Sequence, residues 1–231
     1  MIFSPFMDHR YAWDLVFIID LIFSGIIFIP FFISLFLEKK SRWVCRGSMI
    51  GLSLYILLCW FQNGRAMKLT EVFAHSLNEE VIQVASLPQP LSPFRWAIFI
   101  ETNDKIYQGF VDFLREERPE SVSASSSFFE KLNRLYDPPE KINYRLWTKL
   151  QDSPWVEKAL ATEGVEFYYW FARFPVVKSV NFEDGRHRVE FIDLRFSMPE
   201  VRMPFRYYVE FDHSGRIYSE GFVEDRKKQR E

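Results

Sequence analysis

The sequence has little cysteine, no excess of basic charge and none of the common catalytic motifs. Its two cysteines, Cys45 and Cys59, lie in the first third of the chain, so the rest can form neither a disulfide framework nor a cysteine-based zinc site. The formal net charge is -2 and the pI about 6.2, which argues against a nucleic-acid binder with a basic surface. GxSxG, Walker, GxGxxG and CxxC motifs are absent. The first residues also lack the basic region and cleavage site of a signal peptide.

Two apolar runs dominate the beginning of the chain. Residues 15–37 are almost entirely apolar and long enough to cross a hydrocarbon core of about 30 Å at about 1.5 Å per residue. Residues 44–61 form a shorter second run. The connection between the runs carries four basic residues: Lys39, Lys40, Arg42 and Arg46. By the positive-inside rule this connection is cytoplasmic and the C-terminal part lies outside, which predicts a multi-pass protein of the cell (inner) membrane. The alternative is a pair of buried core helices.

A third pattern follows the second run. Between residues 66 and 86, apolar residues recur at helical spacing, which predicts an amphipathic helix that packs on a domain or lies at the bilayer surface. These residues are Leu69, Val72, Phe73, Leu77, Val81 and Val84. The prolines of the LPQPLSP segment then end the helix.

The remaining sequence is mainly of antiparallel β type. Hairpins are predicted around the turns at 102–105, 184–185 and 214–215. In the return strand of the second hairpin the apolar residues change phase, which predicts a β-bulge near Phe191 and Ile192. Short helices interrupt the strands. Their start signals are a capping box at Ser127 and Glu130, and an N-cap at Ser153 followed by Pro154.

Together these patterns predict a membrane α-helical hairpin followed by an α+β, mainly antiparallel β, soluble domain. The predicted divisions are a transmembrane hairpin over 1–62, an amphipathic helix and linker over 63–87, and a β-rich α+β domain over 88–231. The densely aromatic segment 166–180 is interpreted as core of that domain, with a membrane-facing belt or a ligand slot as alternatives.

Acidic residues at the start of the chain are the main candidates for chemistry. Asp20 lies inside the first apolar run, where a carboxylate costs several kcal/mol unless it is paired, ligated, protonated or near water. Asp14 and Asp20 are therefore candidate catalytic residues, with pairing for packing alone as the alternative. Asp8 and His9 are candidate metal ligands, because carboxylate oxygen and imidazole nitrogen suit zinc or a harder divalent ion. The other three histidines are interpreted as structural or exposed.

The opening segment SPFMDHRYAWDLVFIID resembles membrane-bound metal-dependent hydrolases of the YdjM-like family. The matching residues are Pro5, Phe6, Asp8, Arg10, Asp14, Phe17, Ile18 and Asp20. The segments LPQPLSPFRWAIFIET, WFARFPVV and FIDLRF resemble later parts of that family. The family's histidine-rich metal-site half has no counterpart here, and Leu21 stands where the family usually has proline, so the chain resembles the C-terminal portion. The resemblance implies a divalent metal ion such as zinc, with Asp14 and Asp20 supporting its ligands.

Three functions follow from these observations. In the first, a metal-bound water attacks an ester or phosphoester near the membrane, and the complete enzyme includes the missing half. In the second, a two-helix anchor displays a non-catalytic, extracytoplasmic β-rich module that binds a partner or lipid. In the third, the chain is a subunit whose helical bundle is completed by N-terminal helices or by a partner subunit. None of the three involves nucleic acid.

Overall fold

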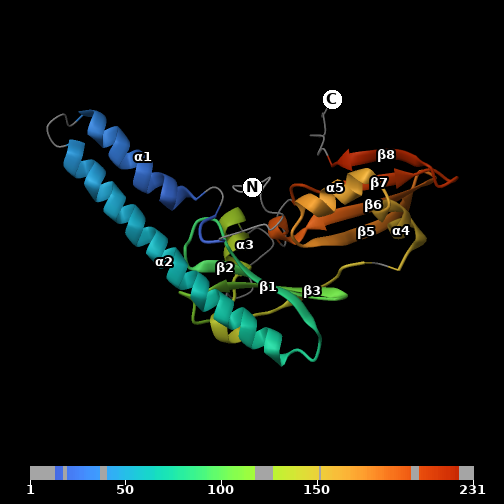
Figure 1. Ribbon diagram of the computed structural model, residues 1–231, viewed down its shortest axis with the longest axis horizontal. Coiled ribbons are helices and arrows are strands. Elements are labelled where there is room, and N and C mark those ends of the chain that lie inside the picture. The colour runs from blue at the N-terminus through green and yellow to red at the C-terminus, as the bar shows by residue number, and fades with distance from the viewer. Residues whose placement is uncertain are drawn as a thin grey trace, which may run out of the picture.

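The computed structural model of the protein describes residues 14–17, 20–36, 41–117, 127–150, 152–198 and 203–223. Two helices open the described chain, and two four-stranded antiparallel sheets follow, with strand orders β1-β2-β3-β4 and β5-β6-β7-β8. Figure 1 shows the helical pair projecting from one side of the body that contains the sheets. The prediction of helices followed by an α+β, mainly antiparallel β part is confirmed.

Helices α1 (Leu21–Phe36) and α2 (Ser41–Ser76) form an antiparallel hairpin (Figure 1). Two small residues of α2, Ser48 and Gly51, lie at the contact with α1. A Cβ added at Gly51 would lie 3.7 Å from Cγ2 of Ile26, and Oγ of Ser48 donates to the carbonyl of Ile26 at 2.6 Å. The first helix begins at Leu21 rather than at residue 15, and α2 runs unbroken through the boundary predicted after residue 62.

Large apolar side chains cover the outside of the hairpin. Within Arg42–Ser76, the most apolar stretch has a mean hydropathy of 1.6, and only 11% of it is buried. By length and composition α2 is thus able to cross a membrane, whereas α1, with 16 residues, is shorter and has no buried residue. Core helices of soluble proteins are mostly buried. The exposure of this stretch therefore argues against the interpretation of the two apolar runs as buried core helices. Exposed examples are Phe28, Phe32, Ile50, Leu54 and Phe61.

The second half of α2 packs on the first sheet. Ala66, Thr70 and Ala74 form a buried stripe on α2, which contacts β1 (Val81–Pro88) and β2 (Arg95–Thr102). The predicted helix over 66–86 is therefore wrong in its second half. Residues Val81 and Val84 lie on β1 instead of the helix, because β1 pairs along its length with β2 and this long-range pairing overrides the local spacing.

The first sheet continues with β3 (Lys105–Asp112) and β4 (Arg145–Thr148), and α3 (Phe128–Arg134) and the 3₁₀ helix η1 (Pro139–Lys141) lie between them in sequence. The predicted hairpin of β2 and β3 is confirmed by their antiparallel register. The predicted capping box is confirmed as well, since the side chains of Ser127 and Glu130 each accept the other's backbone N–H.

The second sheet is preceded by two short helices and contains both other predicted hairpins. The helices are α4 (Pro154–Leu160), capped by Ser153 as predicted, and α5 (Glu163–Phe171). The strands are β5 (Pro175–Glu183), β6 (Arg186–Asp193), β7 (Tyr207–Phe211) and β8 (Ile217–Phe222), with the 3₁₀ helix η2 (Leu194–Phe196) after β6. Within the aromatic segment Tyr168 is buried as the core interpretation requires, but Phe167 and Trp170 are more than half exposed.

The phase change in β6 has a different cause from the predicted bulge near Phe191 and Ile192. The register shift lies on the facing strand, between Val177 and Ser179. From Val189 to Asp193, β6 itself is buried on both faces. Val189 and Phe191 belong to the core beneath α4 and α5, whereas Ile192 belongs to the core that includes residues of the first sheet. The strand therefore supplies residues to two cores in opposite phases.

Candidate functional site

Asp20 caps the N-terminus of α1. Its Oδ1 accepts the backbone N–H groups of Ile22 at 2.8 Å and Phe23 at 2.9 Å, and its Oδ2 accepts the hydroxyl of Tyr55 at 2.6 Å. A carboxylate at this position pairs N–H groups that have no partner within the helix and complements the helix dipole. These three donors explain how an acid is accommodated in an apolar run, and a catalytic role for Asp20 stays a prediction.

Asp14 has entirely different surroundings. Its Oδ2 accepts a hydrogen bond from Nη1 of Arg173 at 2.6 Å, and both side chains of this ion pair are about three-quarters buried. Its carbonyl accepts Nδ2 of Asn63 on α2 at 3.3 Å, and the same Nδ2 lies 3.4 Å from Oγ of Ser86 on β1. Asp14 therefore lies where the opening segment, α2, β1 and the residues after α5 meet. The structure does not bring Asp14 and Asp20 into one site.

A cavity of about 500 Å³ lies at this meeting point. Its apolar lining includes Val16, Phe17, Leu87 and Phe196. Its polar lining includes Asp14, Gln83, Gln89, Arg173 and Arg195. The volume falls within the range typical of small-molecule sites, and the wall combines polar and apolar surface in nearly equal parts.

Arg195 is held in a fixed orientation at the cavity. Its Nε and Nη2 donate to Oδ2 of Asp193 at 2.7 and 2.6 Å, and Nη2 also donates to the carbonyl of Phe171 at 3.0 Å. The guanidinium lies 5.4 Å and 5.1 Å from the ring centres of Phe171 and Phe196. The carboxylate of Asp193 is fully buried and also accepts the backbone N–H of Arg173 at 3.2 Å. One buried acid thus positions both cavity arginines.

Gln89 is a buried polar side chain of the cavity wall. Its Nε2 donates only weakly, to the carbonyls of Leu87 at 3.5 Å and Pro88 at 3.3 Å, and its Oε1 accepts the hydroxyl of Tyr136 at 3.5 Å. Burial raises the pKa of Tyr136 above its usual value of 10, so the hydroxyl stays protonated and remains a donor. The amide nitrogen of Gln89 is therefore a donor with no strong acceptor among its described partners.

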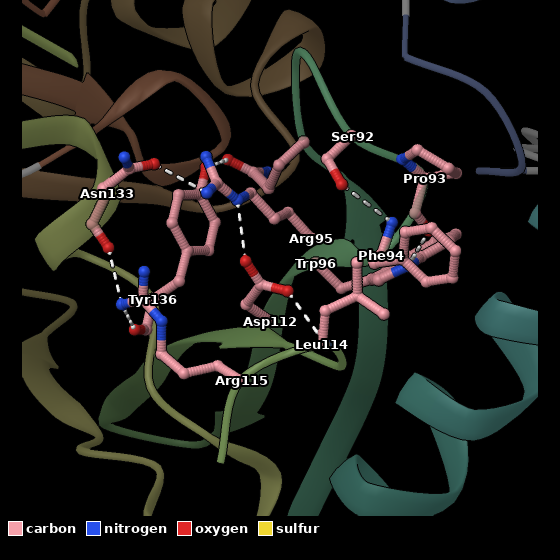
Figure 2. Close-up of polar contacts among 11 residues, drawn as sticks. Ser92, Pro93, Phe94, Arg95, Trp96, Asp112, Leu114, Arg115, Asn133 and Tyr136 are labelled. Atoms are coloured by element: carbon pink, nitrogen blue, oxygen red, sulfur yellow. Dashed lines mark hydrogen bonds and ion pairs between the residues drawn. The ribbon is translucent and has the colours of Figure 1, made fainter. Parts of the chain in front are cut away.

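A network of two partly buried arginines, Arg95 and Arg115, contacts Tyr136 and its neighbours. Figure 2 shows Arg95 between Asp112 and Asn133, to which it donates at 2.9 and 2.6 Å. The guanidinium of Arg95 also lies 4.8 Å from the ring centre of Tyr136. Arg115 donates to the carbonyls of Asn133 and Tyr136, each at 2.7 Å. These contacts fix α3 and the following residues to the first sheet, and we interpret the network as structural.

The described residues do not fit the metal site that the resemblance implies. Asp14 is paired with a guanidinium and Asp20 with three hydrogen-bond donors, so neither carboxylate is oriented toward a shared cation position. Within the described ranges, no three His, Cys, Asp or Glu side chains gather as a metal site would require. Asp8 and His9, the predicted metal ligands, lie outside the described residues.

Comparison of the chain with protein-family models, with curated proteins and with solved structures finds no match. The resemblance to the YdjM-like hydrolases therefore stays a prediction. The cavity arginines were not predicted as functional residues. Their sequence signal is an arginine followed directly by phenylalanine in an aromatic segment, FARF for Arg173 and DLRF for Arg195.

Proposed function

We propose that the protein is a membrane-anchored, non-catalytic binding module in which the α1–α2 hairpin lies in a bilayer and carries both sheets outside it. The supporting observation is the side-chain distribution along α2. Residues 47–64 carry no charge and span about 27 Å, close to the hydrocarbon thickness of about 30 Å. Trp43 and Trp60, 71% and 65% exposed, stand toward the two ends of this stretch, as is typical of residues at membrane interfaces.

The orientation follows from charge. The basic residues of the α1–α2 connection belong on the cytoplasmic side of the cell (inner) membrane, so the sheets are extracytoplasmic. Because α2 is one helix from the connection to its contact with the first sheet, the body is held at a fixed height above the bilayer. The apolar outside of the hairpin faces lipid or the helices of a partner subunit.

Two cysteines test the anchor and its orientation. Cys45 is exposed near the start of α2, and a second label site is provided by Asn103→Cys in the exposed turn between β2 and β3. We expect the full chain to stay in bacterial membranes during alkaline carbonate extraction. A membrane-impermeant maleimide should label residue 103 in spheroplasts, and Cys45 only after permeabilisation. Cys45→Ser combined with Asn103→Cys isolates the second signal. Release by carbonate would refute the anchor, and reversed labelling would refute the orientation.

Metal content separates this proposal from the hydrolase hypothesis. The hydrolase hypothesis requires a tightly bound divalent ion whose retention depends on Asp14 or Asp20. We expect protein purified without chelators to show no stoichiometric metal by plasma emission spectroscopy, and the same content in Asp14→Asn and Asp20→Asn. About one ion per chain, lost in either variant, would instead favour the hydrolase.

A further inference from the structure

The cavity beside Asp14 combines two arginines with an apolar wall. Its charged lining residues are Arg173, Arg195 and Asp14, and the buried carboxylate of Asp193 pairs with Arg195 from outside the lining. Two acids thus balance the two arginines, and the positive charge that a ligand meets is local to their guanidinium groups. Val16, Phe17 and Phe196 place aromatic and aliphatic surface next to this charge. Such a combination suits a ligand with an anionic group at one end and hydrocarbon at the other.

The location of the cavity points to the bilayer as the source of this ligand. Asn63, which contacts both Asp14 and Ser86, lies three residues after Trp60 and at the end of the uncharged stretch of α2. In the proposed orientation this is the level of lipid headgroups, a conclusion that rests on the proposed anchor. Tyr55, which donates its hydroxyl to Asp20, lies deeper along the helix than Asn63.

Arg195 has one guanidinium nitrogen that its acid partner, Asp193, does not use. Its hydrogen bonds within the described chain use Nε and Nη2, which leaves Nη1 for a ligand. Its side chain is 25% exposed, and its position between two aromatic rings and Asp193 fixes the guanidinium before binding. A donor ordered in advance loses little conformational entropy when an anion binds.

Arg173, like Arg195, is held by an acid of the chain, in this case the partly exposed Asp14. The carboxylate of Asp14 accepts a hydrogen bond from Nη1 of Arg173. The backbone of Asp14 has a φ of 38°, an uncommon conformation for aspartate. The anionic group of a ligand competes with this carboxylate for the same guanidinium. Asp14 therefore lowers the affinity of the cavity for anions while Arg195 raises it.

We propose that this cavity binds the phosphate-bearing headgroup of an anionic lipid, with Arg195 and Arg173 contacting the phosphate and the chain passing along Phe17 and Phe196. Gln89 supplies a further donor, since its Nε2 has only long hydrogen bonds in the described chain. Zwitterionic lipids such as phosphatidylcholine bind less tightly, because the positive charge of their headgroup is repelled by the two arginines.

The test uses the full chain in nanodiscs that contain equal parts of phosphatidylcholine and phosphatidylglycerol. Native mass spectrometry of the released protein gives the ratio of bound phosphatidylglycerol to bound phosphatidylcholine. We expect the ratio to exceed one, and Arg195→Gln to lower it about tenfold, as expected for loss of a charged hydrogen bond. Asp14→Asn should raise it about threefold, because one opposing charge is removed. Arg188→Gln, on the second sheet and not part of the cavity lining, is the matched control and should leave it unchanged.

The opposite signs of the two cavity variants keep the test independent of folding defects, since a merely unfolded variant does not gain selectivity. A ratio near one that none of the variants changes would overturn the proposal. Inorganic phosphate that stabilises the protein against heat as well as phosphatidylglycerol does would also overturn it in favour of a small-anion site. Protein that integrates into nanodiscs without lipid preference refutes the lipid site alone. Protein that fails to integrate refutes the anchor first.

Discussion

Replacing Asp20 by alanine tests whether this acid holds the hairpin together. The change removes the cap of α1, worth about 0.5–2 kcal/mol. It also removes the acceptor of the Tyr55 hydroxyl at 2.6 Å, and a hydrogen bond to a charged group contributes about 1.5–3 kcal/mol. We therefore expect Asp20→Ala to lower the free energy of unfolding by about 2–5 kcal/mol, the sum of the two ranges. Asp20→Asn keeps an acceptor and should lose roughly half as much.

The assay is reversible unfolding of the full chain in detergent, followed by tryptophan fluorescence. A double-mutant cycle with Tyr55→Phe isolates the shared hydrogen bond, and we expect a coupling of about 1–2 kcal/mol between the two positions. Ser53→Ala is the control, because Oγ of Ser53 bonds only the carbonyl of Met49 on its own helix. If Asp20→Ala is as stable as the parent, Asp20 has no structural role and its catalytic interpretation gains weight. If instead the two changes are additive, the hydrogen bond with Tyr55 contributes nothing and only the capping role is left.

Two predictions concern the second sheet. Gly164→Ala should cost about 1–3 kcal/mol, because the new Cβ would overlap the hydroxyl of Tyr207, whereas Gly64→Ala, with no atom within 4 Å, should be neutral or up to about 1 kcal/mol stabilising. Thermal unfolding of both variants checks this, and equal losses would contradict it. Burial acts to raise the pKa of Glu190, but Lys178 and neighbouring arginines outweigh it and hold that pKa below 4.5. Glu190 therefore stabilises the fold fully above about pH 4.5, and progressively less as the pH falls through its lower native pKa. We expect the melting temperature to fall less between pH 6 and pH 3 in Glu190→Gln than in the parent, roughly by the part that Glu190 contributes.

Elements fixed by local chemistry were predicted from the sequence. The hairpin at Asp184 and Gly185 depends on two successive residues that tolerate positive φ, and their φ values are 53° and 75°. The end of α2 was not predictable in the same way. Val81 and Val84 match a helical stripe as well as a strand, and only the pairing of β1 with β2, formed by residues later in the chain, decides between them.

The candidate site, too, could be predicted only where the signal is local in sequence. Asp20 was identified because an acid in an apolar run is conspicuous, but its capping role was hidden by the expectation that the helix begins at residue 15. The cavity could not be predicted, because its lining comes from residues 14–17, from β1 and the residue after it, and from positions 172–196. Each segment alone reads as ordinary aromatic or basic sequence, and only the tertiary fold brings the charges of Arg173 and Arg195 to one place.

The packing of both faces of β6 into separate cores explains why these arginines are held rigidly. Phe191 packs into the core under α4 and α5, and Ile192 into the core shared with the first sheet, so the strand cannot shift without disturbing both. Asp193 follows directly, with its carboxylate buried between the backbone N–H of Arg173 and the guanidinium of Arg195. A hinge between the two sheets would have to break the contacts of Ile192 in the shared core. The cavity arginines are therefore held by packed and hydrogen-bonded residues, and a ligand that binds Arg173 has to displace the carboxylate of Asp14.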